Sequence, residues 1–305
     1  MTQTAQPVRG VEMPRAVQLL RRATPRPAQL AVRSMARTYG ARTAEHRPLP
    51  DYLIVGTQRG GTTTLHHWLT AHPGVLPARL TKGVHWFDTA FGRPEAWYRS
   101  HFPSRRVRAS AAERLGYEPV VGEGSPYYMF HPYAPARIAS VLPDPRLLVV
   151  LRDPVERAWS QYHHETARGF EDFPFEAALE AEAGRLAGEA ERLEDPRATS
   201  HSHQHHSYEA RGRYAEQLEE LWRQLGRDRV LVLFSDDLSA DPLGTMTAVH
   251  RFLGLPAVAP DTERRWNLRA KPELPEAARA RLVEAFRGPD ARLAELLGRP
   301  VPWAK

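Results

Sequence analysis

Short apolar runs alternate with amphipathic stretches along most of the chain. Four runs have the length and the polar borders of buried strands: Tyr52–Val55, Val120–Gly122, Leu147–Leu151 and Val230–Phe234. Apolar residues recur at helical spacing in residues 63–71, 134–141, 155–168, 175–192, 208–225 and 242–253, and two short helices are expected at 275–287 and 290–297. This alternation predicts the α/β class, with a central, mostly parallel sheet flanked by helices.

The charge of the chain is concentrated near its start. Residues 1–50 contain nine arginines and two glutamates, so they carry +7, and the rest of the chain carries −1 of the net +6. We expect a basic tail over residues 1–48, with short helices around 14–23 and 27–42, and one domain over residues 49–305. Contact with anionic lipid or an acidic partner would explain the tail, and so would packing on the domain.

The composition restricts the compartment and the partners. The chain has no cysteine, which excludes disulfides and agrees with a reducing compartment. Its first residues lack the apolar core of a signal peptide, and no apolar run is long enough to span a bilayer. We expect a cytoplasmic protein, peripheral at the inner membrane face where the tail attaches it. The net charge of −1 after the tail argues against nucleic acid as a partner.

A glycine-rich turn follows the first predicted strand, in the sequence VGTQRGGTTTL. Gly56 and Gly61 have the G-x-x-x-x-G spacing of a phosphate-binding loop, but Thr62 stands where nucleoside triphosphatases need lysine. The turn instead offers a cation, backbone that an anion can approach closely, and hydroxyls with amides at a helix N-terminus. These groups belong to Arg59, Gly60, Gly61, Thr62, Thr63 and Thr64. The turn therefore predicts a site for an anion of the size of phosphate.

A second anion site is predicted at the end of a later strand, in the sequence LLVVLRDPVERAWSQY. Arg152 is the first polar residue after Leu147–Leu151, and Asp153 with Pro154 begins a helix as N-cap and first helical residue. Ser160 lies on the same helix face as Asp153, so Arg152 and Ser160 could hold one anion together. A structural ion pair is the alternative role for Arg152.

Four motifs in this order carry a family resemblance: VGTQRGGTTTL, KGVHWFD, GEGSPYY and LRDPVERAWSQY. They resemble the carbohydrate sulfotransferases, the group that includes heparan sulfate 3-O-sulfotransferases, over roughly residues 50–300. The resemblance implies the P-loop-like sulfotransferase fold, so that residues 49–305 form a sulfotransferase domain. It also implies 3′-phosphoadenosine 5′-phosphosulfate (PAPS) as donor, a hydroxyl-bearing acceptor and no metal. The alternative is a nucleotide-dependent kinase or NTPase of the P-loop type.

The resemblance also assigns roles to residues. Arg59 to Thr64 would hold the 5′-phosphosulfate, and Arg152 with Ser160 would hold the 3′-phosphate. The segment RRWNLRAKPELP resembles a donor-contacting segment, in which Arg269 and Lys271 would help to bind the 3′-phosphate. Relatives usually have lysine at position 59; Arg59 keeps the positive charge but cannot give up its proton at neutral pH, so it would stabilise the leaving group by charge.

The catalytic base departs from the pattern of the glycan-modifying enzymes. They often carry glutamate where this chain has Gly83, and some carry lysine where it has Gly124. His85 is the first candidate for the base, since an imidazole titrates near neutral pH and is expected to be available in its neutral form. A buried core histidine is the alternative role for His85. Glu123, which follows a strand, is the second candidate.

The histidine-rich stretch His201–His206 lies in a segment, residues 185–207, that we expect to be an inserted loop. Its short, irregular spacing does not fit a defined metal site. These histidines could instead border the acceptor cleft or lie in solvent. The acceptor itself stays open among a glycan, a glycolipid and a small natural product such as a glycosylated molecule.

Overall fold

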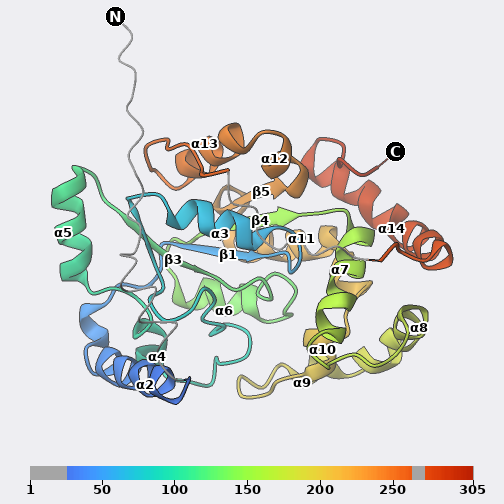
Figure 1. Ribbon diagram of the computed structural model, residues 1–305, viewed down its shortest axis with the longest axis horizontal. Coiled ribbons are helices and arrows are strands. Elements are labelled where there is room, and N and C mark those ends of the chain that lie inside the picture. Colours follow the sequence, from blue (N-terminus) through green and yellow to red (C-terminus); the bar gives the residue numbers. More distant parts are fainter. Residues whose placement is uncertain (1–25, 263–271, 305) are drawn as a thin grey trace, which may run out of the picture.

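The central feature of the structure, a computed structural model that describes residues 26–262 and 272–304, is one parallel sheet. Its strands lie in the order β2, β3, β1, β4, β5, and all pairings are parallel (Figure 1). The strands are β1 Tyr52–Gly56, β2 Val75–Pro77, β3 Val120–Gly124, β4 Arg146–Leu151 and β5 Val230–Phe234. The predicted fold class and all four predicted strands are therefore confirmed. Sequence reasoning missed β2, a three-residue edge strand that ends in proline and pairs only with β3.

Helices cover both faces of the sheet (Figure 1). The predicted helices at 63–71, 134–141, 155–168 and 242–253 are present, with small shifts at their ends. The α-helices are α2 Arg26–Arg42, α3 Thr62–Thr70, α4 Glu95–Arg99, α5 Arg105–Leu115, α6 Ala134–Val141, α7 Pro154–Thr166, α8 Phe175–Leu186, α9 Glu189–Arg192, α10 His201–His205, α11 Tyr214–Leu225, α12 Ser235–Ala240, α13 Pro242–Phe252 and α14 Glu276–Leu297. Short 3-10 helices are η1 Ala44–His46, η2 Ala210–Gly212 and η3 Arg227–Arg229.

The structure corrects the prediction of two C-terminal helices. Residues 276–297 form the single helix α14, which continues through Pro289. Phe286 and Leu293, seven residues apart and both buried, anchor the two halves on one face, so packing outweighs the local cost of the proline.

Two further helix predictions and the prediction of an inserted loop need correction. The predicted helix 175–192 divides into α8 and α9, because Gly188 adopts a left-handed conformation with φ of 74°. The predicted helix 208–225 begins later, at Tyr214, after η2. The segment 185–207 is not a plain inserted loop, since α9 and α10 lie within it and His203 and His205 are buried. The helices α4 and α5 were not predicted.

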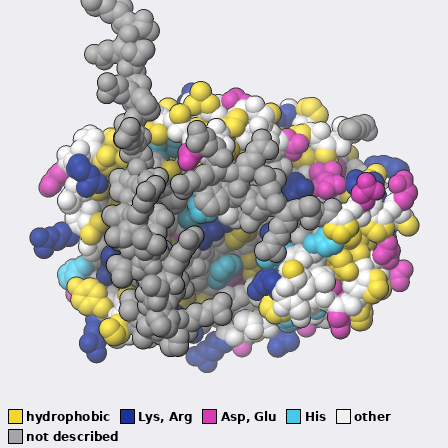
Figure 2. All heavy atoms as spheres, in the orientation of Figure 1, with side chains coloured by type: hydrophobic (Ala, Val, Ile, Leu, Met, Phe, Trp, Pro, Cys, Tyr) yellow, Lys and Arg dark blue, Asp and Glu magenta, His cyan; other side chains and the backbone are white. Residues whose placement is uncertain are grey.

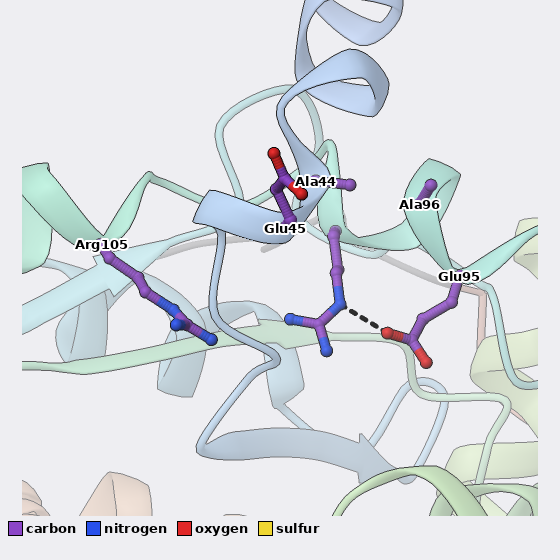
Figure 3. A pocket seen from close by; sticks show the side chains of 6 residues that line it. Ala44, Glu45, Glu95, Ala96 and Arg105 are labelled. Carbon is purple, nitrogen blue, oxygen red and sulfur yellow. Dashed lines mark hydrogen bonds and ion pairs between the residues drawn. The ribbon is translucent and has the colours of Figure 1, made fainter.

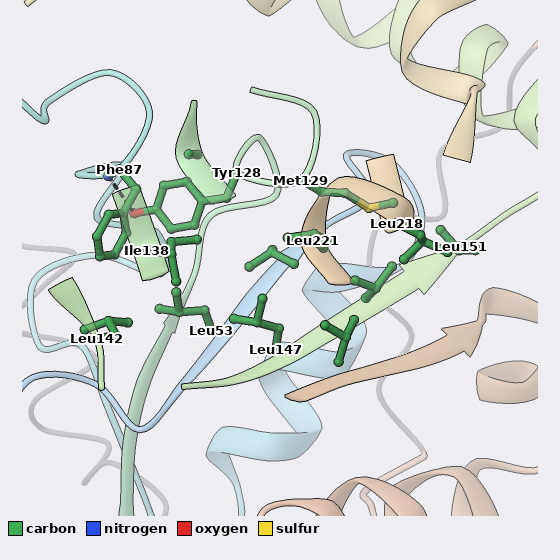
Figure 4. Close-up of a cluster of buried hydrophobic side chains, with 14 of the residues drawn as sticks. Leu53, Phe87, Tyr128, Met129, Ile138, Leu142, Leu147, Leu151, Leu218 and Leu221 are labelled. Carbon is green, nitrogen blue, oxygen red and sulfur yellow. Dashed lines mark hydrogen bonds between the residues drawn. The ribbon is translucent and has the colours of Figure 1, made fainter. Parts of the chain in front are cut away.

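The alternation of β1 side chains builds a core on each face of the sheet. Tyr52 and Ile54 pack with α3, α12 and α13 on one face, while Leu53 and Val55 pack with α6, α11 and α14 on the other. Figure 4 shows the second core, in which Leu147 and Leu151 of β4 lie close to Leu218 and Leu221 of α11. Burial on both faces explains why the strands are continuous apolar runs.

The N-terminal segment packs on the domain at one edge. The helix α2 confirms the predicted helix 27–42, and Gly40 lies so close to Ser100 that an added Cβ would be 2.8 Å from it. The Arg47 guanidinium donates to the Phe102 carbonyl. A cavity of about 350 Å3 lies between η1 and α4, lined by Ala44, Glu45, Glu95, Ala96, Arg99 and Arg105 (Figure 3). The other predicted tail helix, 14–23, lies outside the described residues. Within the described residues, no helix is long and apolar enough to cross a membrane.

Candidate functional site

The candidate site lies at the carboxyl ends of three neighbouring strands, β3, β1 and β4. The residues that follow them are Ser125, Thr57 and Arg152. β1 has β3 on one side and β4 on the other, and α3 and α7, which follow β1 and β4, begin at this edge. Such a switch point in a parallel sheet is where ligands commonly bind.

The loop after β1 is folded tightly against β4. The Thr57 amide donates to the Val150 carbonyl over 2.9 Å, and the Gly60 amide donates to the Thr57 carbonyl over 2.9 Å. A Cβ on Gly60 would lie 2.5 Å from the Val150 carbonyl oxygen, so the position tolerates only glycine. Gly61 has φ of 110° and caps α3, which begins at Thr62. The loop thus presents the first-turn amides of α3 at the strand edge, as an anion requires.

Arg59 joins the two predicted anion sites. Its Nε donates to Ser160 Oγ over 3.0 Å, and its backbone carbonyl accepts a long hydrogen bond of 3.5 Å from Arg152 Nη1. Residues predicted to hold two separate anionic groups therefore lie next to one another. Asp153 caps α7 as predicted, by accepting the amides of Val155 and Glu156. Arg152 also contacts Glu156 over 3.8 Å, a weak ion pair on a half-exposed surface.

Lys82 is a site residue that sequence reasoning missed. Its Nζ lies 3.4 Å from Thr62 Oγ1 and 3.2 Å from Thr63 Oγ1, at the N-terminus of α3. Burial lowers the pKa of Lys82 to about 8, although the Glu123 carboxylate counteracts part of this effect. Lys82 was visible in the motif KGVHWFD, but nothing in the sequence placed it against a loop twenty residues earlier.

His85 and Asp88 form a hydrogen-bonded pair beside this cation. His85 Nδ1 lies 2.8 Å from Asp88 Oδ2, and Asp88 is fully buried. Burial lowers the pKa of His85, but the charge and hydrogen bond of Asp88, together with Glu123, outweigh it and raise the pKa to about 9. The expectation of a neutral imidazole at pH 7 is therefore wrong in this environment. Asp88, three residues after His85, was not singled out from the sequence.

Glu123 lies beneath the site and is fully buried. Its carboxylate accepts hydrogen bonds from the Val84 amide, Ser125 Oγ and Tyr128 OH over 3.0, 2.7 and 2.7 Å, and from Tyr98 OH over 3.4 Å. Burial raises the pKa of Glu123. A carboxylate with all its lone pairs engaged favours a role in holding the 82–88 segment over a role as base.

Two glycines open the space around the imidazole. A Cβ on Gly83 would lie 2.7 Å from the Gly124 carbonyl oxygen and 3.1 Å from His85 Nε2, and a Cβ on Gly124 would lie 3.4 Å from Lys82 Cε. The side chains of His85 and Lys82 thus occupy the space that side chains at positions 83 and 124 would need.

Comparison with known proteins identifies the family. Residues 49–274 match the family described as "Sulfotransferase domain". The chain belongs to the sulfotransferase family. It is 29% identical to human heparan sulfate glucosamine 3-O-sulfotransferase 6, over 84% of this chain and 74% of that protein. It is 31% identical to mouse heparan sulfate glucosamine 3-O-sulfotransferase 3B1, over 72% of this chain and 49% of that protein. A sulfotransferase from Alicyclobacillus acidocaldarius superposes with a TM-score of 0.63 at 27% identity, covering 83% of this chain and 98% of that one.

The histidine-rich segment of this sulfotransferase reaches the loop after β1 through hydrogen bonds. His205 Nδ1 lies 3.0 Å from Glu165 Oε2, and Glu165 Oε1 accepts from Gln58 Nε2 over 3.0 Å. Gln58 precedes Arg59, so α10 and α7 help to fix the loop. Among the described residues, no group of three histidine, aspartate or glutamate side chains could hold a metal ion.

Two residues of the predicted site lie outside the described residues. Arg269 and Lys271 fall in residues 263–271 and are not described. On the face shown in Figure 2, Lys, Arg and His side chains lie near the middle, between the atoms drawn in grey. The proposed donor contacts of Arg269 and Lys271 stay predictions.

The pairing with Asp88 predicts the titration of His85. Asp88→Asn removes the charge that raises the pKa of His85, while burial still lowers it, so the pKa should fall clearly below its wild-type value of about 9. Imidazole NMR shifts measured against pH would show the change. The control Asp172→Asn, an exposed carboxylate elsewhere, should leave His85 unchanged. An unaltered His85 titration in Asp88→Asn would contradict the assigned cause.

Proposed function

We propose that the protein transfers a sulfuryl group from PAPS to an acceptor hydroxyl. The main observation that supports this proposal is that Arg59 contacts both Ser160 and Arg152 beside the N-terminus of α3. The hydrogen-bonded pair of His85 and Asp88 lies on the neighbouring segment. One edge of the sheet thus offers sites for two anionic groups and a base. A nucleotide phosphorylated at two separate positions needs this arrangement, and membership of the sulfotransferase family supports the choice of donor.

The described residues suit the proposed donor. The amides at the start of α3, Arg59 and Lys82 would surround the phosphosulfate, and Arg152 with Ser160 would hold the 3′-phosphate. Thr62 and Thr63 point their hydroxyls to the Lys82 ammonium, so cation and hydroxyls form one polar group. PAPS would supply an activated sulfuryl group, and we expect the transfer to need no metal.

His85 is the proposed base. Asp88 binds Nδ1, so a neutral imidazole carries its proton there and leaves the Nε2 lone pair for the acceptor hydroxyl. The acceptor oxygen attacks sulfur as His85 takes its proton, and the electron pair of the broken S–O bond stays on the phosphate oxygen. Arg59 and Lys82 would stabilise that oxygen by charge, because the guanidinium does not give up a proton.

The raised pKa sets the pH dependence of this step. His85 acts as base only when neutral, and its pKa is raised to about 9. The neutral fraction of His85 therefore increases about tenfold from pH 7 to pH 8. Its side chain is 39% exposed, so an acceptor can reach the ring.

The acceptor is proposed to be a glycan, a glycolipid or a glycosylated small molecule. Two matched relatives are, by name, heparan sulfate glucosamine 3-O-sulfotransferases. This chain shares their family, but Gly83 and Gly124 change the surroundings of the acceptor, so its substrate is to be identified independently.

We also propose that the basic N-terminal region attaches the protein peripherally to an anionic membrane on the cytoplasmic side. Arg37 and Arg42 of α2 are exposed, and Met35 and Tyr39 of the same helix are 66% and 67% exposed. Figure 2 shows further Lys and Arg side chains along the rim near α2 and α5. Exposed apolar groups among arginines suit an anionic lipid surface.

The donor sites predict nucleotide selectivity. Adenosine 3′,5′-bisphosphate should bind far more tightly than AMP or ATP with magnesium, and Arg152→Ala should weaken its binding about thirty- to hundredfold by removing a charged phosphate partner. Ser160→Ala should have a smaller effect. Calorimetry would measure the affinities, with Arg223→Ala on α11 as a control for charge. Equal affinity for AMP and the bisphosphate would refute the sulfotransferase proposal.

The base assignment predicts the rate and its pH profile. His85→Ala should lower kcat by about 10²–10⁴-fold with donor affinity intact. The wild-type kcat/KM should rise with pH to an inflection near 9. Burial lowers the pKa of His85, but Asp88 and Glu123 together raise this pKa by more, to about 9. Glu123→Gln should have the smaller effect on kcat.

These rates would be measured in sulfation assays with labelled PAPS and a sugar hydroxyl as acceptor. His46→Ala, at an exposed histidine, is the control. Near-normal turnover by His85→Ala together with a large loss in Glu123→Gln would reverse the assignment.

The membrane proposal predicts a charge-dependent attachment. Changing Arg37 and Arg42 to glutamine should reduce co-sedimentation with phosphatidylserine vesicles severalfold while turnover of a soluble acceptor stays unchanged. The control changes Arg223 and Arg287, exposed arginines of other helices, to glutamine. If both double variants bound vesicles equally well, attachment through α2 would be excluded.

A further inference from the structure

Arg152 lies at a junction where the backbone belongs to no regular element. β4 ends at Leu151, and the first helical hydrogen bond of α7 runs from the Arg157 amide to the Asp153 carbonyl. The carbonyl of Arg152 lies between the two, outside both the strand and the helix. A backbone carbonyl in such a place needs a donor from another part of the fold.

Tyr214, the first residue of α11, supplies that donor. Its hydroxyl donates to the Arg152 carbonyl over 2.8 Å, although the two residues are 62 positions apart in the sequence. Burial raises the pKa of Tyr214, so the phenol keeps its proton at neutral pH and can donate it. The hydrogen bond fixes the peptide group between Arg152 and Asp153, and therefore the backbone that carries the Arg152 side chain.

Packing holds the Tyr214 ring in one place. The residue is 1% exposed and belongs to the hydrophobic core on the α6, α11 and α14 side of the sheet. Trp303 lies edge-on to it, with 6.3 Å between the ring centroids, and the Trp303 indole donates to Asp290 over 2.8 Å. Two residues before Tyr214, an added Cβ on Gly212 would lie 3.1 Å from the Pro154 side chain. The start of α11 is thus fixed against the start of α7.

The contacts of the Arg152 guanidinium are long in comparison. Its Nη1 lies 3.5 Å from the Arg59 carbonyl, and its Nη2 lies 3.8 Å from Glu156 Oε2. Glu156 has a shorter contact of 3.0 Å with Arg279 of α14. Contacts as long as those of Arg152 are weak and do not by themselves fix a guanidinium. The position of this side chain therefore depends on the backbone that carries it, which Tyr214 holds.

We propose that Tyr214 is a positioning residue of the 3′-phosphate site, whose hydroxyl holds the Arg152 backbone so that the guanidinium meets the 3′-phosphate of the donor. The proposal rests on the proposed function, because it requires that Arg152 binds this phosphate. Tyr214 is buried and acts through Arg152, not on the nucleotide. Loss of its hydroxyl should therefore affect recognition of the 3′-phosphate and spare the 5′ part, since the loop after β1 has its own hydrogen bond from Thr57 to Val150.

The test measures the affinity of the full chain for adenosine 3′,5′-bisphosphate and for AMP by calorimetry. The ratio of the two affinities reports the contribution of the 3′-phosphate. Tyr214→Phe keeps the ring and removes one hydrogen bond, so the ratio should fall about fivefold while the affinity for AMP stays unchanged. Tyr162→Phe on α7 is the matched control, because the Tyr162 hydroxyl also donates to a carbonyl, that of Phe173, over 3.0 Å. Its ratio should equal that of the wild type.

A second measurement separates positioning of Arg152 from a general effect on the fold. Arg152→Ala lacks the group that Tyr214 is proposed to hold, so the addition of Tyr214→Phe to this variant should leave the ratio unchanged. A further pair of variants places 4-aminophenylalanine or 4-methylphenylalanine at position 214. Both fill the space of tyrosine but only the amino group can donate, so the amino variant should keep the wild-type ratio and the methyl variant should lose it.

Each outcome has a distinct meaning. A wild-type ratio that persists in Tyr214→Phe, or an equal loss of affinity for both nucleotides, would overturn the role of Tyr214 alone. So would a further fall of the ratio when Tyr214→Phe is added to Arg152→Ala. If Tyr214→Phe does not fold, equal ratios in the amino and methyl variants would overturn the role. Equal affinity of the wild type for AMP and the bisphosphate would overturn the proposed donor together with this role.

Discussion

The buried carboxylate of Glu123 ties the end of β3 to the segment that carries Lys82, His85 and Asp88. It accepts the Val84 amide and three hydroxyls while it is wholly shielded from water. A charge in such a place is tolerable only because every partner is present, and removal of one partner leaves an uncompensated group. The positions of His85, the proposed base, and of Lys82 therefore depend on a residue that need not touch substrate.

Backbone strain marks the same region. Arg59 and His85 are the two non-glycine residues of the described chain with positive φ, at 68° and 55°. Each such residue costs on the order of 1 kcal/mol and persists only where its surroundings hold it. The loop of Arg59 is held by the bonds of Thr57 and Gly60, and His85 by Asp88 and by the Ser125 hydroxyl on its amide. The two strained residues are those proposed to act on opposite sides of the transferred group.

The sequence predicted the strands and helices whose apolar residues follow a recognisable pattern. Strands buried on both faces are continuous apolar runs, and helices with one apolar stripe have a period of about 3.6 residues, so β1, β4 and α6 could be located closely. The loop motif and Arg152 could be found because they directly follow strands. Lys82, Asp88 and the link from His205 to Gln58 could not, because each depends on contacts between distant segments or on an orientation without periodicity. Pro289 misled for a related reason, since only tertiary packing shows why α14 continues.

The absence of side chains at positions 83 and 124 leaves space that the side chains of His85 and Lys82 occupy. A glutamate at position 83 could not coexist with the present positions of the Gly124 carbonyl and the His85 ring. The absence of these side chains leaves room for the imidazole, and Asp88 gives that imidazole the basicity that a carboxylate lacks. The nearby Lys82 places a cation at the N-terminus of α3, in the loop proposed to bind the donor. The proposed base and the Lys82 cation thus come from one short segment, whose position β3 fixes through Glu123.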